Sequence, residues 1–182
     1  MVTGIALAGG LFASATLYTS RVQLPKPHEY HLMLQGDVGV WDGEFEMALM
    51  DQKLQGKIVE TVESFGDFWT IRRLEGSILG TPFHGTYQLG YDPGAQEFMG
   101  TWIDTLSHNM AVMRGQYAAE ARTLRMEFKG PDMLGNEVDH WNTSHYDALG
   151  RRIFESWVRD TEGKEVRTMT ITFTRRLEQE DK

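Results

Sequence analysis

The sequence predicts an all-β fold: an antiparallel up-and-down barrel of about ten strands, preceded by a short N-terminal helix. Three observations support this prediction. Segments of alternating apolar and polar residues recur along the chain, short turns rich in glycine and aspartate separate them, and no long helical pattern lies between them. Because an open sheet of this many strands would leave unpaired edges, closure into a barrel is the favoured arrangement.

The clearest of these segments is 80–104, which is predicted to form two strands joined by a tight turn. Asp92-Pro93-Gly94 supplies the turn, because proline presets φ at the first central position and glycine takes the positive φ of the second. Aromatic and small residues share one face of this hairpin, which is typical of a barrel wall. They are Phe83, Gly85, Tyr87, Leu89 and Tyr91 on the first strand, and Phe98, Gly100 and Trp102, with Asp104, on the second.

The other elements are expected in chain order around this hairpin. A short helix over 28–35 precedes strands over 38–49, 56–65, 67–75, 109–117, 122–129, 137–146, 151–159 and 165–176. In the first strand Gly43 interrupts the alternation, which predicts a bend or bulge. In the last strand Met169, Ile171 and Phe173 alternate with threonines, so one face is expected to point inward.

Composition restricts the class of protein. At 182 residues, with 41% hydrophobic and 24% charged residues, the chain fits one globular domain with a sizeable core. The net charge of −8 argues against nucleic acid or an anionic membrane surface as the main partner, since both require a clustered basic face. The absence of cysteine excludes disulfides and thiolate metal sites.

The ends of the chain differ from the barrel in composition. Residues 1–20 contain no charged side chain, and an apolar stretch there is followed by Ala13-Ser14-Ala15, which resembles a signal-peptidase site. An export signal, a weak membrane anchor and a frayed tail all remain open, because basic leading residues are missing. The protein is expected to be exported or periplasmic in the first two cases and cytoplasmic otherwise. Segment 21–37 is expected to be a linker and short helix, 38–177 the barrel, and 178–182 a charged tail.

Three groups of residues carry a family resemblance. They are the run from Pro27 to Leu32 followed by Gly39-Val-Trp41, the pair Gly90-Tyr-Asp-Pro and Thr101-Trp-Ile-Asp104, and the closing run 169–176. Together they resemble the bacterial family called domain of unknown function 1579, over roughly His28 to Arg176. The resemblance implies a barrel fold and brings no activity with it.

A second resemblance concerns the closed end of the barrel. Gly39-x-Trp41 and the late Arg175-Arg176 are similar to the lipocalin-like (calycin-type) barrels. In those proteins a tryptophan of the first strand plugs one end, and an arginine of the last strand lies across its indole. This resemblance implies that Trp41 stacks with Arg175 or Arg176, gaining cation–π attraction while the guanidinium reaches loop carbonyls.

The leading functional interpretation is a binder of a small hydrophobic molecule, because the interior of a ten-stranded barrel is wider than side chains readily fill. The expected lining residues are Tyr87, Trp102, Asp104, Met110 and Trp157. Asp104 and His84 are expected to orient any polar end of the ligand. Glu44, Glu46, Glu60 and Glu63 are expected on the outer face.

Two alternatives remain open. An enzyme of the same fold would use Asp104 with His84 or His108 as acid and base or as metal ligands, although familiar catalytic motifs such as Gly-x-Ser-x-Gly are absent. An assembly module would have a filled interior and pair through a sheet edge. The sequence identifies no cofactor, although a single inward His140 or His145 could ligate a haem iron, as in haem-binding ten-stranded barrels.

Overall fold

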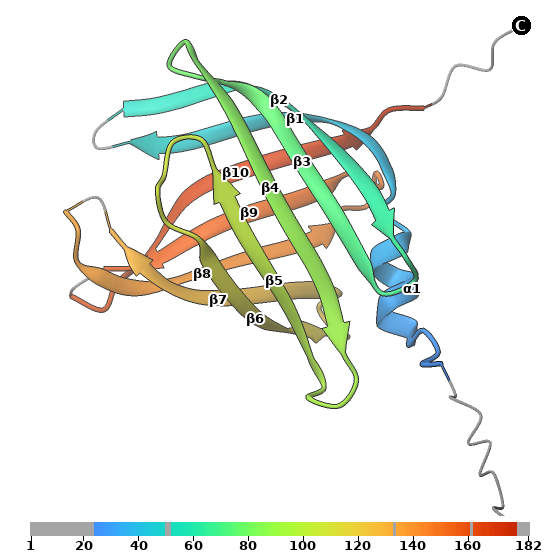
Figure 1. Cartoon of the computed structure of the whole chain (residues 1–182). Coiled ribbons are helices and arrows are strands. Elements are labelled where there is room, and N and C mark those ends of the chain that lie inside the picture. The colour runs from blue at the N-terminus through green and yellow to red at the C-terminus, as the bar shows by residue number, and fades with distance from the viewer. Residues whose placement is uncertain (1–23, 50–51, 133, 161, 178–182) are drawn as a thin grey trace, which may run out of the picture.

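Ten antiparallel strands close into a barrel, and one short helix lies at one end of it (Figure 1). The computed structural model describes residues 24–49, 52–132, 134–160 and 162–177. The expectations for segments 1–20 and 178–182 fall outside these residues. The elements are α1 (Glu29–Gln35), β1 (Gly39–Leu49), β2 (Gln52–Phe65), β3 (Trp69–Ile78), β4 (Thr81–Asp92), β5 (Glu97–Asp104), β6 (Ala111–Ala118), β7 (Thr123–Pro131), β8 (Glu137–Tyr146), β9 (Arg152–Arg159) and β10 (Glu165–Arg175).

Each strand pairs with its neighbours in sequence, and β1 also pairs with β10, which closes the barrel. The predicted all-β up-and-down barrel with a short N-terminal helix is therefore confirmed. No helix in the described part of the chain is long and apolar enough to span a membrane.

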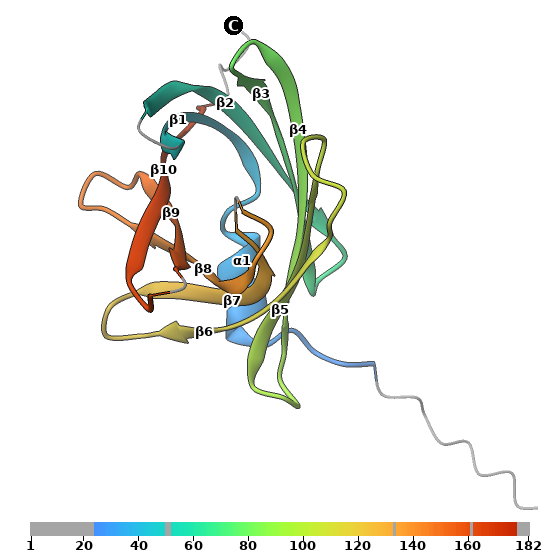
Figure 2. The ribbon, with the colours of Figure 1, turned by 90° about the vertical axis from the view of Figure 1, so that its left-hand side faces the viewer.

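Two histidines hold helix α1 in place: His28 caps its N-terminus, and His31 lies within it. The His28 ring accepts a hydrogen bond from the Tyr30 backbone N–H, and His31 Nδ1 accepts one from the His28 backbone N–H at 2.7 Å. His31 is buried, and its Nε2 donates to the Tyr91 carbonyl at 2.8 Å. Helix α1 contacts β3 and β4, and Figures 1 and 2 show it at one end of the barrel. Both histidines are therefore committed to helix capping and docking.

Two details of the sequence prediction are corrected. The ladder between β1 and β2 runs through Gly43 without a shift, and the register shift lies instead in β10, between Arg167 and Met169. Glycine is needed at position 43 for space, because a Cβ there would lie 2.7 Å from Ile58 Cγ2.

In the β4–β5 turn, Gln96 rather than the predicted Gly94 has the positive φ, at 56°. The turn is held by Asp92, whose Oδ1 accepts the Gly94 N–H at 2.8 Å and the Ala95 N–H at 3.2 Å. These hydrogen bonds from the backbone to the Asp92 side chain stabilise the turn, which is longer than a two-residue hairpin loop.

Candidate binding cavity

The barrel encloses a cavity of about 620 Å³. Met33 and Leu34 of α1 line one end of it, and Leu106 and Ser107 of the loop after β5 line the other. Between them the wall is mainly apolar, with contributions from most strands. Examples are Phe45, Phe83, Leu89, Met113, Met126 and Phe154.

Glycines on β4 and β5 let aromatic rings lie against the cavity wall. Tyr87 and Trp102 are directly paired in the ladder between β4 and β5, so their side chains lie on the same face of the sheet. The Trp102 ring lies over Gly85, where a Cβ would clash with it, and the Tyr87 ring lies over Gly100, where a Cβ would sit 2.7 Å from Tyr87 Cε2. The rings therefore cover the neighbouring backbone. The alternation of glycine and aromatic residues seen in the sequence is the local cause.

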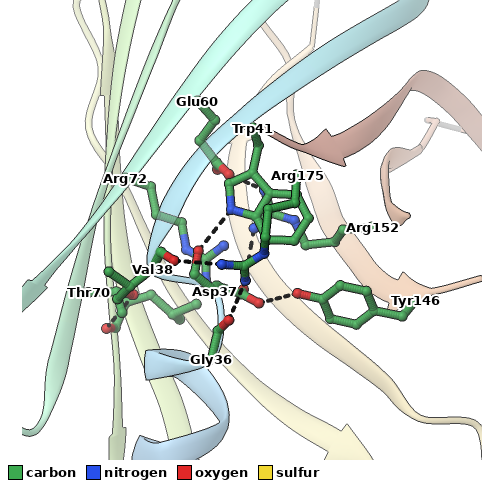
Figure 3. Close-up of polar contacts among 11 residues, drawn as sticks. Gly36, Asp37, Val38, Trp41, Glu60, Thr70, Arg72, Tyr146, Arg152 and Arg175 are labelled. Atoms are coloured by element: carbon green, nitrogen blue, oxygen red, sulfur yellow. Dashed lines mark hydrogen bonds and ion pairs between the residues drawn. The ribbon is translucent and has the colours of Figure 1, made fainter. Parts of the chain in front are cut away.

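A buried cluster of charged residues lies at the α1 end of the cavity (Figure 3). Asp37, just after the helix, accepts a hydrogen bond from Arg72 Nη2 at 2.6 Å and one from Arg152 Nη1 at 3.3 Å, both on its Oδ2. Its Oδ1 accepts the Tyr146 hydroxyl, and Glu60 accepts from Arg152 Nη2. The four charged side chains are buried and carry two positive and two negative charges.

The pKa values in this cluster shift in the directions that pairing dictates. Burial alone would raise the pKa of Asp37, but Arg72, Arg152 and the Tyr146 hydroxyl together hold it below its usual value. Burial alone would lower the pKa of Arg72, and the attraction of Asp37 and Glu60 raises it instead. Asp37 and Arg72 are therefore both charged at neutral pH.

The same end of the barrel is closed by Trp41, which is buried and donates its indole N–H to the Asp37 carbonyl at 2.8 Å. Arg175 lies over the indole, with Cζ 4.3 Å from the ring centroid, and donates to the Val38 carbonyl at 2.7 Å. Arg152 also lies near the ring, at 4.9 Å. Arg176 instead pairs with Asp42 at the exposed surface. Arg175 thus ties β10 to the segment after α1.

Of the six residues predicted for the ligand site, Tyr87, Trp102 and Asp104 line the cavity, and His84, Met110 and Trp157 do not. His84 lies between the inward Phe83 and Gly85, so strand alternation turns it outward. Met110 precedes β6 in an exposed loop and is 61% exposed. Trp157 follows Ser156, which lines the cavity, and therefore lies on the outer face; there it stacks on Trp141, and Arg167 Cζ lies 5.7 Å from its ring.

Asp104 has partners other than histidine. Its Oδ2 accepts the Trp102 indole N–H at 2.8 Å, and its Oδ1 accepts the Leu106 backbone N–H at 2.8 Å. His84 and His108 are exposed. Among the residues that the structure describes, no group of three or more histidine, aspartate and glutamate side chains is placed to hold a metal. The carboxylate therefore orients Trp102 and caps the turn after β5.

The inward histidine of β8, His140, packs against an aromatic ring, and its buried Nε2 has no hydrogen-bond partner among the described residues. His140 stacks on Phe128 with ring centroids 4.9 Å apart and an interplanar angle of 11°. Both lie on the inward phase of their strands, but Phe128 lines the cavity and His140 does not.

The charged cluster is the part of the site that sequence reasoning missed. Glu60 was expected on the outer face, but it shares the inward phase of β2 with Ile58 and Val62. Arg72 likewise lies on the inward phase of β3, between Thr70 and Leu74. A charged side chain in phase with buried neighbours is the signal that could have revealed both. Asp37 and Arg152 lie outside any such pattern, at the ends of elements.

The fold and the cavity define a class: a ten-stranded closed antiparallel barrel with a largely apolar interior. The chain belongs to the family described as protein of unknown function (DUF1579), which matches residues 26–175. Its structure is similar to that of Rv2717c from M. tuberculosis, with a TM-score of 0.62 and 11% sequence identity, over 84% of this chain and 100% of that one. That likeness concerns the fold. No curated protein sequence matches the chain.

We expect Tyr87 and Tyr146 to resist ionisation at alkaline pH. Burial raises the pKa of both hydroxyls, and at Tyr146 the negative charge of Asp37 adds to the effect. In the unfolded chain both hydroxyls have a pKa near the ordinary value of 10.0. The stabilisation of the fold by these two groups is therefore complete below that pH and is lost as the pH rises above it. Tyrosinate absorbance during alkaline titration should show two of the six tyrosines appearing only as the barrel unfolds. Their ionisation in the folded barrel, near pH 10, would contradict this.

Proposed function

We propose that the protein binds a small, mainly apolar molecule inside the barrel. The observation that carries the proposal is the cavity of about 620 Å³, whose wall is formed chiefly by aromatic, methionine and aliphatic side chains. Its size falls within the range of pockets that hold small ligands, roughly 300–1,000 Å³. An open apolar space of this size forfeits packing contacts that a protein interior normally makes, and a bound apolar molecule would restore them.

The residues that line the cavity favour a site that accepts apolar ligands of different shapes. Met33, Met113 and Met126 contribute flexible thioether side chains to the wall, and such side chains adapt to ligands of different shape. The Trp102 and Tyr87 rings add broad flat surface. The cavity also argues against the assembly module, which requires a filled interior. The net charge of −8 favours a small apolar ligand over a polyanion.

The proposal is tested by filling the cavity. Ser156 lines it from β9, so Ser156→Trp places an indole in the space. Val112 on β6 is 60% exposed and does not line the cavity, so Val112→Trp adds the same ring on the outside as a matched control. We expect the neutral fluorescent probe N-phenylnaphthylamine to bind the unaltered protein and the Val112→Trp variant alike. Ser156→Trp is expected to weaken its binding at least tenfold, which corresponds to about 1.4 kcal/mol.

Folding of each variant is checked by circular dichroism and thermal unfolding before titration. A folded Ser156→Trp variant that binds the probe as tightly as the unaltered protein would show that the cavity is not the binding site. Absence of probe binding to the unaltered protein, together with native mass spectra that show no bound apolar molecule, would contradict the proposed function itself.

A further inference from the structure

Three buried hydrogen-bond donors of cavity-lining residues have no hydrogen-bond partner among the residues that the structure describes. They are Arg72 Nε, Arg152 Nε and the Tyr87 hydroxyl. A buried donor without an acceptor costs about 1–3 kcal/mol, so three such groups in one interior call for an explanation. The two guanidinium nitrogens can only donate, so the missing partner is an acceptor.

The three donors belong to the same end of the cavity. Arg72 and Arg152 share one carboxylate oxygen, Asp37 Oδ2, through their other nitrogens (Figure 3). Tyr87 lies directly opposite Arg72 in the pairing of β3 with β4. The rest of the cavity wall is mainly apolar and includes Phe45, Phe83 and Phe154. The interior thus combines a charged α1 end with a mainly apolar remainder, and Asp104 and Ser107 lie at the opposite end.

Charge decides which kind of acceptor fits. The two guanidinium groups are already matched by Asp37 and Glu60, so the cluster is neutral overall. A carboxylate or phosphate would bring an uncompensated negative charge into a buried site, where desolvation is expensive. A neutral oxygen needs only a hydrogen bond in exchange for the water that it loses. Each of the three donor atoms is covered by neighbouring groups, so a ligand oxygen reaches them only when these side chains shift.

We propose that the ligand is a neutral amphiphile, with an apolar chain or ring system and one uncharged oxygen, such as a hydroxyl or a carbonyl, that accepts hydrogen bonds from Tyr87 and Arg72 at the α1 end of the barrel. This proposal rests on the proposed function and narrows it to a chemical class. The apolar part lies along the Phe83 and Phe154 wall, and the oxygen meets the Arg72–Tyr87 pair.

Three probes of equal chain length test the proposal: decane, decanol and decanoate, each displacing N-phenylnaphthylamine at neutral pH. Decanol is expected to bind the unaltered protein roughly tenfold or more tightly than decanoate. Tyr87→Phe keeps the ring and removes the hydroxyl, so it should weaken decanol three- to tenfold and leave decane unchanged. The matched control is Tyr91→Phe, on the same inward phase of β4 but packed against α1 rather than lining the cavity. It should change neither affinity.

The outcomes separate the two proposals. If decane displaces the probe but Tyr87→Phe leaves decanol affinity unchanged, or if decanoate binds as tightly as decanol, recognition of a neutral oxygen at this end is wrong while the apolar cavity stands. If neither the probe nor decane binds, the proposed function fails and this proposal fails with it. Thermal unfolding shows whether the Tyr87→Phe variant is folded. Its stability should equal or exceed that of the unaltered protein, because the substitution removes a hydroxyl that has no partner.

Discussion

Replacement of Asp37 by asparagine is expected to lower the free energy of unfolding by about 3–5 kcal/mol, because it breaks a buried ion-pair cluster from one side. Arg72 and Arg152 both bond Asp37 Oδ2, and after the substitution only Glu60 remains to balance two buried guanidinium charges. Tyr146 also loses its charged acceptor. Asparagine has nearly the same size, so the change reports on charge rather than on a cavity. Urea denaturation followed by circular dichroism measures it.

The matched control is Asp42→Asn. Asp42 also pairs with an arginine, but Asp42 and Arg176 are both half-exposed, so solvent compensates for the lost pair. We expect little change in the denaturation midpoint for this variant. Equal effects of the two substitutions would show that the buried cluster does not contribute as the structure implies.

The same carboxylate gives stability a dependence on acid pH. The pKa of Asp37 lies below 3.8 in the folded protein, so on acidification the unfolded chain takes up this proton first. Stabilisation from Asp37 is therefore fully present well above pH 3.8, and falls as the pH drops through that value and through the folded pKa. The Asp37→Asn variant should lack this part of the slope. Denaturation at several acid pH values, compared between the two proteins, provides the measurement.

Replacement of Trp41 by alanine is expected to cost about 3–5 kcal/mol of stability, as is typical for a large aromatic core residue. Trp41 is 1% exposed and belongs to the core cluster with Phe45, Ile58 and Phe173. Its loss removes the surface on which Arg175 lies and the indole hydrogen bond to the Asp37 carbonyl. The variant should therefore also loosen the junction between α1 and β10. Amide hydrogen exchange of 29–38 is expected to accelerate.

Phe65→Ala serves as the control for this substitution. Phe65 ends β2 and is 68% exposed, so its truncation removes little buried surface. Circular dichroism rather than tryptophan fluorescence follows unfolding, because the substitution removes one of the fluorophores. A Trp41→Ala variant as stable as Phe65→Ala would mean that the barrel end closes without the indole.

Strand number and order were accessible from the sequence because they rest on local signals. Alternation and short turns place β8 at Glu137–Tyr146, as predicted, and β10 within one residue of the prediction. The predicted hairpin over 80–104 forms, and its turn, longer than predicted, pairs Tyr87 with Trp102. The errors concern single positions. At Gly43, for example, glycine leaves space for Ile58 of β2, and its own strand has no bulge there.

The candidate site was predicted unevenly for the same reason. Tyr87, Trp102 and Asp104 share a face of one hairpin, so alternation alone placed them together, and they line the cavity. His84, Met110 and Trp157 were also predicted at the site, but the phase of the strand or the position in a loop puts them outside the cavity.

By itself the sequence determined an antiparallel barrel of about ten strands, because period-two alternation and turn chemistry act over a few residues. Only the tertiary structure decided that Asp37, Glu60, Arg72 and Arg152 form one buried cluster. These residues come from the helix end, β2, β3 and β9, and closure of the barrel brings them together. Alternation indicates that Glu60 and Arg72 face inward, but it does not indicate which residues of other elements they pair with. The polar end of the cavity, which sets the proposed ligand class, therefore became visible only in the folded chain.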